Sequence, residues 1–195
     1  MKFLRPGEGP DVVALLTLKH RQIEALLAEA EQRADPEKCC GALNKAASEL
    51  LLHMAVEEAA FYPAVRRWAA EVLPPSTTVV GDSTHAGLKA ALAAVRRWAP
   101  AEPGFGPACS RLREEAVHHH RAEEASTFRH LAQSMPAAER EAIGHLVAEN
   151  ERALRASSSA GASVSADPWA FTPSQAAGRG SSSQSCSQGL CSGST

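Results

Sequence analysis

Apolar residues recur every three or four positions through most of the first 155 residues, which is the spacing of one face of an α-helix. Four long stretches share this pattern, at residues 12–33, 36–72, 82–99 and 108–134. A shorter stretch follows Pro136 and fades near Arg155. Asp11 and the Asp35-Pro36 pair are suited to cap the first two helices. Long helices with short links predict an all-α fold, an up-down-up-down antiparallel four-helix bundle with a short fifth helix.

The composition changes abruptly after Ala156, where Ser, Gly, Ala and Gln replace most charged and large apolar residues. Such a segment buries too little apolar surface to offset the entropy lost on ordering it. We therefore expect an N-terminal arm over residues 1–10, one domain over 11–155 and a disordered Ser/Gly-rich tail over 156–195.

Charge and hydropathy argue against several classes of protein. The formal net charge is only -2, and no basic stripe of the kind that binds nucleic acid is present. No apolar run approaches the length of a membrane-spanning helix, and no signal-peptide pattern is visible. The odd number of cysteines, with Cys39 next to Cys40, does not resemble a secreted disulfide framework. We expect a cytoplasmic protein without nucleic-acid or membrane partners.

Two similar phrases, His53-x-x-x-Glu57-Glu58 and His119-x-x-x-Glu123-Glu124, lie in the second and fourth helical stretches. Residues four apart on a helix face the same way, about 6 Å apart. Each phrase therefore directs one imidazole and one carboxylate toward one point. Lone histidines on the apolar stripes of the first and third stretches complete a weak two-fold repeat.

The histidines and glutamates on these apolar stripes form one candidate metal site. Its members are His20, His53, Glu57, His85, His119 and Glu123. A single histidine on an apolar face is usually a core residue bonded to a backbone carbonyl. A buried carboxylate, however, costs several kcal/mol unless a cation or a metal ion meets it. The combination on four helices therefore predicts metal binding.

Imidazoles and carboxylates without thiolates suit iron, manganese or zinc. Carboxylates can span two ions about 3.5–4 Å apart. One pair of histidines would bind each ion and the glutamates would bridge both: His20 with His53, His85 with His119, and Glu57 with Glu123. About four protein ligands for each ion would leave room for a bridging oxygen species and an open position.

These motifs resemble the hemerythrin-like proteins with HHE cation-binding domains. The resemblance covers residues 11–155 and includes Leu16-Thr17-Leu18-Lys19-His20, Phe61-Tyr62-Pro63 after the first motif, and Phe128 after the second. It implies a four-helix bundle with a non-heme centre of two iron ions bridged by carboxylates. Members of the family bind dioxygen, sense oxygen, iron or redox state, or handle nitric oxide and peroxide stress.

One position departs from the oxygen-carrying hemerythrins, which place a second histidine one turn after the first on the third helix. This chain has Lys89 there, four residues after His85. The centre therefore has one imidazole fewer, or Lys89 shields an open site, or a neutral lysine binds the metal. This difference favours a sensing, redox or iron-handling role over reversible oxygen carriage.

The expected function is binding of a small exogenous ligand, namely dioxygen, nitric oxide or peroxide, at the di-iron centre. The alternatives are a peroxidase-like or nitric-oxide-reducing enzyme on the same fold and a metal-free helical interaction module. For the enzyme, the available proton donors would be outward neighbours of the ligands: Glu58, Glu124, Tyr62 and His120. The histidines outside the ligand set are expected at the surface: His118, His120, His130 and His145.

Overall fold

A computed structural model describes residues 9–32, 35–72 and 82–161, and all regular secondary structure among them is helical. The α-helices are α1 (Val12–Gln32), α2 (Pro36–Val56), α3 (Tyr62–Val72), α4 (Asp82–Val95), α5 (Phe105–Glu123), α6 (Arg129–Ser134) and α7 (Ala137–Gly161). Two π-helical turns, η1 (Glu57–Phe61) and η2 (Glu124–Phe128), join α2 to α3 and α5 to α6. The expected all-α fold is confirmed. Within the described ranges, no helix is both long and apolar enough to cross a membrane.

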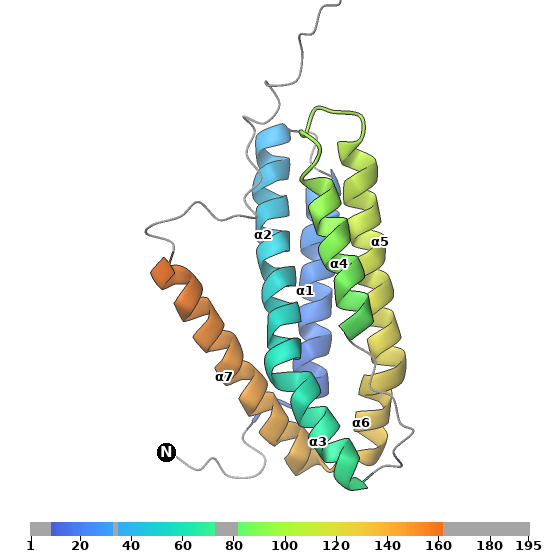
Figure 1. The fold of residues 1–195 in the computed structure, drawn as a ribbon, viewed down its shortest axis with the longest axis vertical. Helices are drawn as coiled ribbons and strands as arrows, with labels where there is room; N and C mark the ends of the chain where they lie inside the picture. The colour runs from blue at the N-terminus through green and yellow to red at the C-terminus, as the bar shows by residue number, and fades with distance from the viewer. Residues whose placement is uncertain (1–8, 33–34, 73–81, 162–195) are drawn as a thin grey trace, which may run out of the picture.

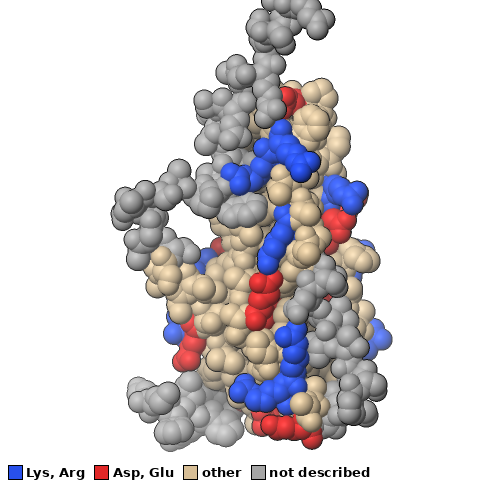
Figure 2. All heavy atoms as spheres, in the orientation of Figure 1, with Lys and Arg blue, Asp and Glu red and all other residues tan. Residues whose placement is uncertain are grey.

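The helices α1, α2, α4 and α5 lie side by side along the long axis of the molecule, and successive ones run in opposite directions (Figure 1). α1 packs against α2 and α5, and α4 packs against α5. α7 crosses obliquely and contacts α1, α2 and η1. The face drawn in Figure 2 carries both acidic and basic side chains among uncharged surface.

The first two helices begin at the residues that the sequence predicts. The backbone N–H of Val13 donates to Oδ1 of Asp11 at 2.9 Å. Asp35 caps α2 in the same way, accepting from the N–H of Lys38 at 3.0 Å, with Pro36 in the first turn. Each carboxylate satisfies an amide that has no partner within the helix.

α5 begins at Phe105, earlier than the expected residue 108, and α7 extends beyond Arg155 to Gly161. The expectation that α7 would be short was wrong, since it has 25 residues. Its later turns are held to the neighbouring helices by ion pairs, including Arg155 with Glu49 at 2.6 Å. The first six residues of the expected tail, 156–161, are therefore helical, and the rest of that tail lies outside the described residues.

The buried interior consists of two apolar clusters with polar residues between them. The first apolar cluster joins α1, α2, α4 and α5, and includes Ile23, Leu50, Leu92 and Leu112. The second apolar cluster joins the start of α1 to η1, α3, η2, α6 and α7, and includes Leu16, Phe61, Phe128, Leu131 and Val147. Along α1, His20 falls between Leu16 and Ile23. The buried polar residues thus form a layer with apolar packing on either side.

Replacing Asp35 with Ala is expected to lower the free energy of unfolding by about 1 kcal/mol, because the N–H of Lys38 loses its acceptor. Chemical denaturation would measure the change. Lys38→Ala is the matched control, since it keeps the backbone amide and removes only an exposed side chain. Equal stability of the two variants would contradict the capping role of Asp35.

Candidate metal centre

All six residues that the sequence nominates lie in the polar layer, and each is at most 5% exposed. They come from four α-helices and one π turn: His20 from α1, His53 from α2, Glu57 from η1, His85 from α4, and His119 and Glu123 from α5. Their side chains meet at the level where the two apolar clusters meet. The tertiary structure therefore brings the whole predicted set together.

The two carboxylate oxygens of Glu57 divide the four imidazoles into two pairs. Its Oε1 lies 3.2 Å from Nε2 of His53 and 4.0 Å from Nε2 of His20. Its Oε2 lies 3.1 Å from Nε2 of His85 and 3.9 Å from Nε2 of His119. The rings agree with this division, because the centroids within each pair are 4.9 Å apart. Glu57 therefore occupies the position of a carboxylate that could bridge two ions.

Glu123 approaches the same centre from α5. Its Oε2 lies 3.4 Å from Nε2 of His20 and 4.0 Å from Nε2 of His119, so it touches one member of each imidazole pair. Donor atoms from His20, Glu57 and Glu123 lie within 4.8 Å of one another, as do donor atoms from His53, Glu57 and His119. In both groups the donor atoms are close enough that a metal ion could bind all three by drawing them closer.

The second glutamate of each motif orients a histidine from the other half of the repeat. Glu124 accepts from Nδ1–H of His20 at 2.8 Å, and Glu58 accepts from Nδ1–H of His85 at 2.9 Å. When the ring is neutral, a carboxylate on one ring nitrogen sets the tautomer and leaves a lone pair on the other nitrogen that can bind a metal ion. Glu58 and Glu124 thus support the ligands, and they are bound to ligand histidines instead of being available as proton donors.

Both motifs run into a π-helical turn, which begins at the first glutamate of the first motif and at the second glutamate of the second motif. The N–H of Tyr62 donates to the carbonyl of Glu57, and the N–H of Arg129 donates to the carbonyl of Glu124, each five residues back. Such turns are rare and are often found at functional sites. Pro63 follows only the first turn, so proline is not what produces them. The two-fold repeat of the sequence therefore has a counterpart in the backbone.

Tyr62 is buried against the centre, so its expected outward position was wrong. Its hydroxyl donates to Oε2 of Glu57 at 3.3 Å and lies 3.4 Å from Nε2 of His85. Burial, followed by the charges of Glu57 and Glu123, raises the pKa of this phenol above its usual range. Tyr62 is five residues after Glu57, and two residues at this spacing lie on the same face of a π turn but not of an α-helix.

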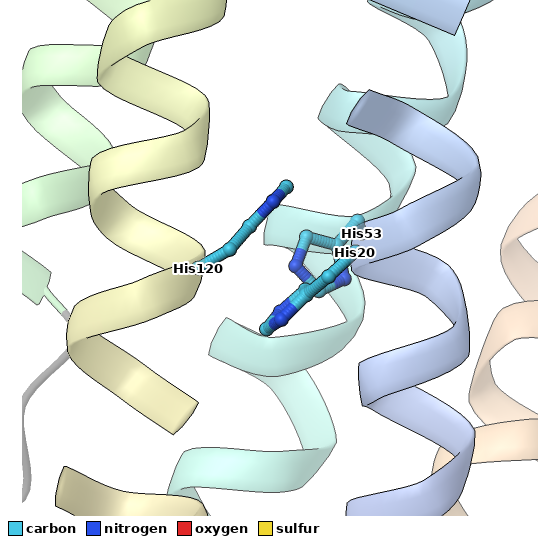
Figure 3. Close-up of side chains that lie close together, drawn as sticks. All are labelled: His20, His53 and His120. Atoms are coloured by element: carbon cyan, nitrogen blue, oxygen red, sulfur yellow. The ribbon is translucent and has the colours of Figure 1, made fainter. Parts of the chain in front are cut away.

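His120 was also expected at the surface, but it is fully buried. Its ring stacks on that of His20, with centroids 4.0 Å apart, and Nδ1–H donates to Glu24 at 2.9 Å. Figure 3 shows His120 reaching from α5 toward His20 and His53. His118 is exposed as expected, whereas His130 and His145 are partly buried. An indication of this position in the sequence is Glu24, which lies four residues after His20 on α1 and therefore on the same side of that helix.

Lys89 is directed away from the centre. Its Nζ lies 2.7 Å from Oε1 of Glu58, and its side chain is 47% exposed. Glu58 in turn holds His85, so Lys89 supports the site from outside. The sequence allows three interpretations of Lys89, and the one in which its amine binds the metal does not fit this geometry.

The pKa values of the ionisable groups in the centre are shifted in different directions. Burial raises the pKa of Glu123 to about 7, helped by the nearby charge of Glu57. Burial also favours protonated Glu57, but the surrounding imidazoles outweigh it and hold that pKa well below its usual range. For His20, the carboxylates of Glu123, Glu57 and Glu124 overcome burial and raise the pKa to about 9. For His53 burial dominates and lowers the pKa to about 4.

Several buried polar atoms of the centre have no hydrogen-bond partner. They are Nε2 of His20, both ring nitrogens of His53, Oε1 of Glu57 and both carboxylate oxygens of Glu123. A buried polar atom without a partner typically costs about 1–3 kcal/mol. A metal ion would satisfy inward-facing nitrogen and oxygen lone pairs together, so the donor set fits such a group.

A cavity of about 20 Å³ adjoins the centre at His53. Apolar side chains from α1, α2 and α7 line most of it, including Leu16, Leu52 and Val147. Lys19 and Glu151, which are paired at 2.6 Å, also line it. This space is enough for about one water-sized molecule.

Comparison of the chain with family models, with curated proteins and with solved structures gives no match.

Metal binding is expected to release more protons at pH about 6.5 than at about 8.5, because ligands must be deprotonated. Glu123, with a pKa of about 7, is protonated only at the lower pH, while His20, with a pKa of about 9, is protonated at both. Apparent affinity should therefore rise with pH up to about 9. Calorimetry of Zn²⁺ binding in buffers of different ionisation enthalpy measures the release; equal release at both pH values would contradict this prediction.

Lys89→Met is expected to leave metal content unchanged, since the amine points to Glu58 and exposed ion pairs contribute little. His85→Gln is the comparison, because it removes a nitrogen that faces Glu57 at 3.1 Å. Elemental analysis of both purified variants would decide the matter. Loss of metal from Lys89→Met, at the level seen for His85→Gln, would restore Lys89 as a ligand.

Proposed function

We propose that this protein is a non-heme iron protein of hemerythrin-like type, a four-helix bundle whose polar layer holds two iron ions. The observation that carries this proposal is the division of four imidazoles between the two oxygens of Glu57. A carboxylate with a pair of imidazoles at each oxygen is the arrangement expected of a bridging ligand between two ions. His20 and His53 would hold one ion, and His85 and His119 the other.

The chemistry of the donors is compatible with iron, the metal that the resemblance to hemerythrin-like proteins implies. The set has four imidazoles and two carboxylates and no thiolate, which suits iron, manganese or zinc among biological metals. Bound iron would supply redox chemistry and affinity for a small exogenous ligand. The protein's part is to orient the imidazoles through Glu58 and Glu124 and to exclude bulk water with the two apolar clusters.

The exogenous ligand we propose is a diatomic molecule or peroxide, and the role is sensing, redox chemistry or iron handling. Two features support an exogenous ligand of this small size. The protein ligands number about four for each ion, which leaves coordination positions open. The cavity beside His53 has room for about one water-sized molecule.

Protein produced with sufficient iron is expected to contain about two iron ions per chain, and Glu123→Gln is expected to reduce this content to about one or less. The carboxylate of Glu123 touches both imidazole pairs, and an amide cannot replace a bridging carboxylate. Elemental analysis and Mössbauer spectroscopy would measure the content. Glu114→Gln, at an exposed position of α5, is the matched control.

Wild-type protein that contains no iron, with Glu123→Gln unchanged in metal content and equally stable, would contradict the proposal. That result would favour a metal-free helical module.

The position of Tyr62 favours an enzyme as the second candidate. Its hydroxyl, 3.3 Å from Glu57, places a hydrogen-bond donor beside the centre, although its raised pKa makes it a weak acid. In the reduction of peroxide by an external reductant, such a donor would stabilise the negative charge that develops on the departing oxygen. Tyr62→Phe keeps the ring packing and removes the hydroxyl, so an enzyme should keep its iron and lose peroxide turnover. Unchanged turnover, or no turnover in the wild type, would leave binding or sensing as the function.

A further inference from the structure

His120 has the features of the histidines that face the centre, although its position in the motif is that of a flanking residue. It is fully buried, and its Nε2 has no hydrogen-bond partner. One ligand nitrogen from each of His20, His53 and His120 lies within 4.8 Å of the other two. Figure 3 shows the rings of His20 and His120 face to face with His53 beside them.

Its orientation is controlled in the same way as that of His20 and His85. Glu24, whose side chain is 22% exposed, accepts from Nδ1–H of His120 at 2.9 Å. Glu124 and Glu58 do the same for His20 and His85. A histidine with Nδ1 fixed by a carboxylate presents Nε2 as a lone-pair donor, which is the usual arrangement around metal-binding histidines.

Packing alone does not account for an imidazole at this position. His20 lies between two parallel rings, His120 at 4.0 Å and Phe128 at 5.3 Å. Phe128 provides a stacking surface without any polar atom, and phenylalanine at position 120 would do so as well. The imidazole instead introduces a buried nitrogen without a partner, which destabilises the protein unless something binds it.

We propose that His120 is a ligand of the ion held by His20 and His53, so that this ion has three imidazoles and its neighbour has two. The inference rests on the proposed function. An ion at the centre of the three nitrogens would lie at most about 2.8 Å from each, compared with about 2.0–2.1 Å in zinc–imidazole bonds, so the nearly parallel rings of His20 and His120 must tilt toward the ion to complete the coordination.

Titration of the metal-free protein with Co²⁺, followed by its visible absorption and by competition with a chelator, tests this assignment. The wild type should bind two ions in two unequal steps. His120→Gln and His120→Phe should weaken the tighter step about 10-fold or more, and the Phe variant keeps the stacking on His20. His118→Gln is the matched control, because His118 is the preceding residue and is exposed. Thermal unfolding of each metal-free variant checks that it folds.

A second measurement uses the wild type and does not depend on the folding of any variant. In protein labelled with ¹⁵N-histidine and loaded with Co²⁺, every bound imidazole gives a strongly shifted ring N–H signal. Five such signals support the proposal, and four overturn it.

The outcomes separate this inference from the proposed function. If His120→Gln binds two ions with wild-type affinity and absorption, the assignment of His120 fails and the paired centre stands. If the wild type binds a single ion that His120→Gln loses, the assignment holds and the paired centre fails. A wild type that binds no Co²⁺ overturns both.

Discussion

The structure depends on placing the Glu57 carboxylate in the interior. A buried carboxylate is unfavourable by several kcal/mol unless positive charge or metal surrounds it. Here the compensation comes from imidazoles on four different helices, two at each oxygen. No single helix could supply them, so the contacts of this one side chain link α1, α2, α4 and α5.

The surroundings of the polar layer strengthen those contacts. The two apolar clusters exclude water from both sides, and charges interact more strongly where the local dielectric is low. Glu58 and Glu124 add a link between the halves of the repeat, since each holds a histidine from the other half. Neither half can therefore orient its own lone histidine. The site is therefore complete only when the two halves of the repeat pack together.

Much of the candidate site was predictable because its signals are local. The spacing in His53-x-x-x-Glu57 and His119-x-x-x-Glu123 places each pair on one helix face, and the apolar neighbours show that this face is buried. Tyr62 was misjudged because a π turn changes the residue spacing after Glu57. The length of α7 was underestimated because ion pairs with other helices hold residues whose composition suggests disorder.

The sequence by itself determined the helical class, the caps at Asp11 and Asp35, and the six buried donors, since these follow from periodicity and short-range hydrogen bonds. Only the tertiary structure decided which imidazoles share each oxygen of Glu57, that Lys89 faces outward, and that His120 belongs to the polar layer. These depend on the packing of helices distant in sequence. The rotation of one helix against another is set by side-chain contacts that no local pattern records.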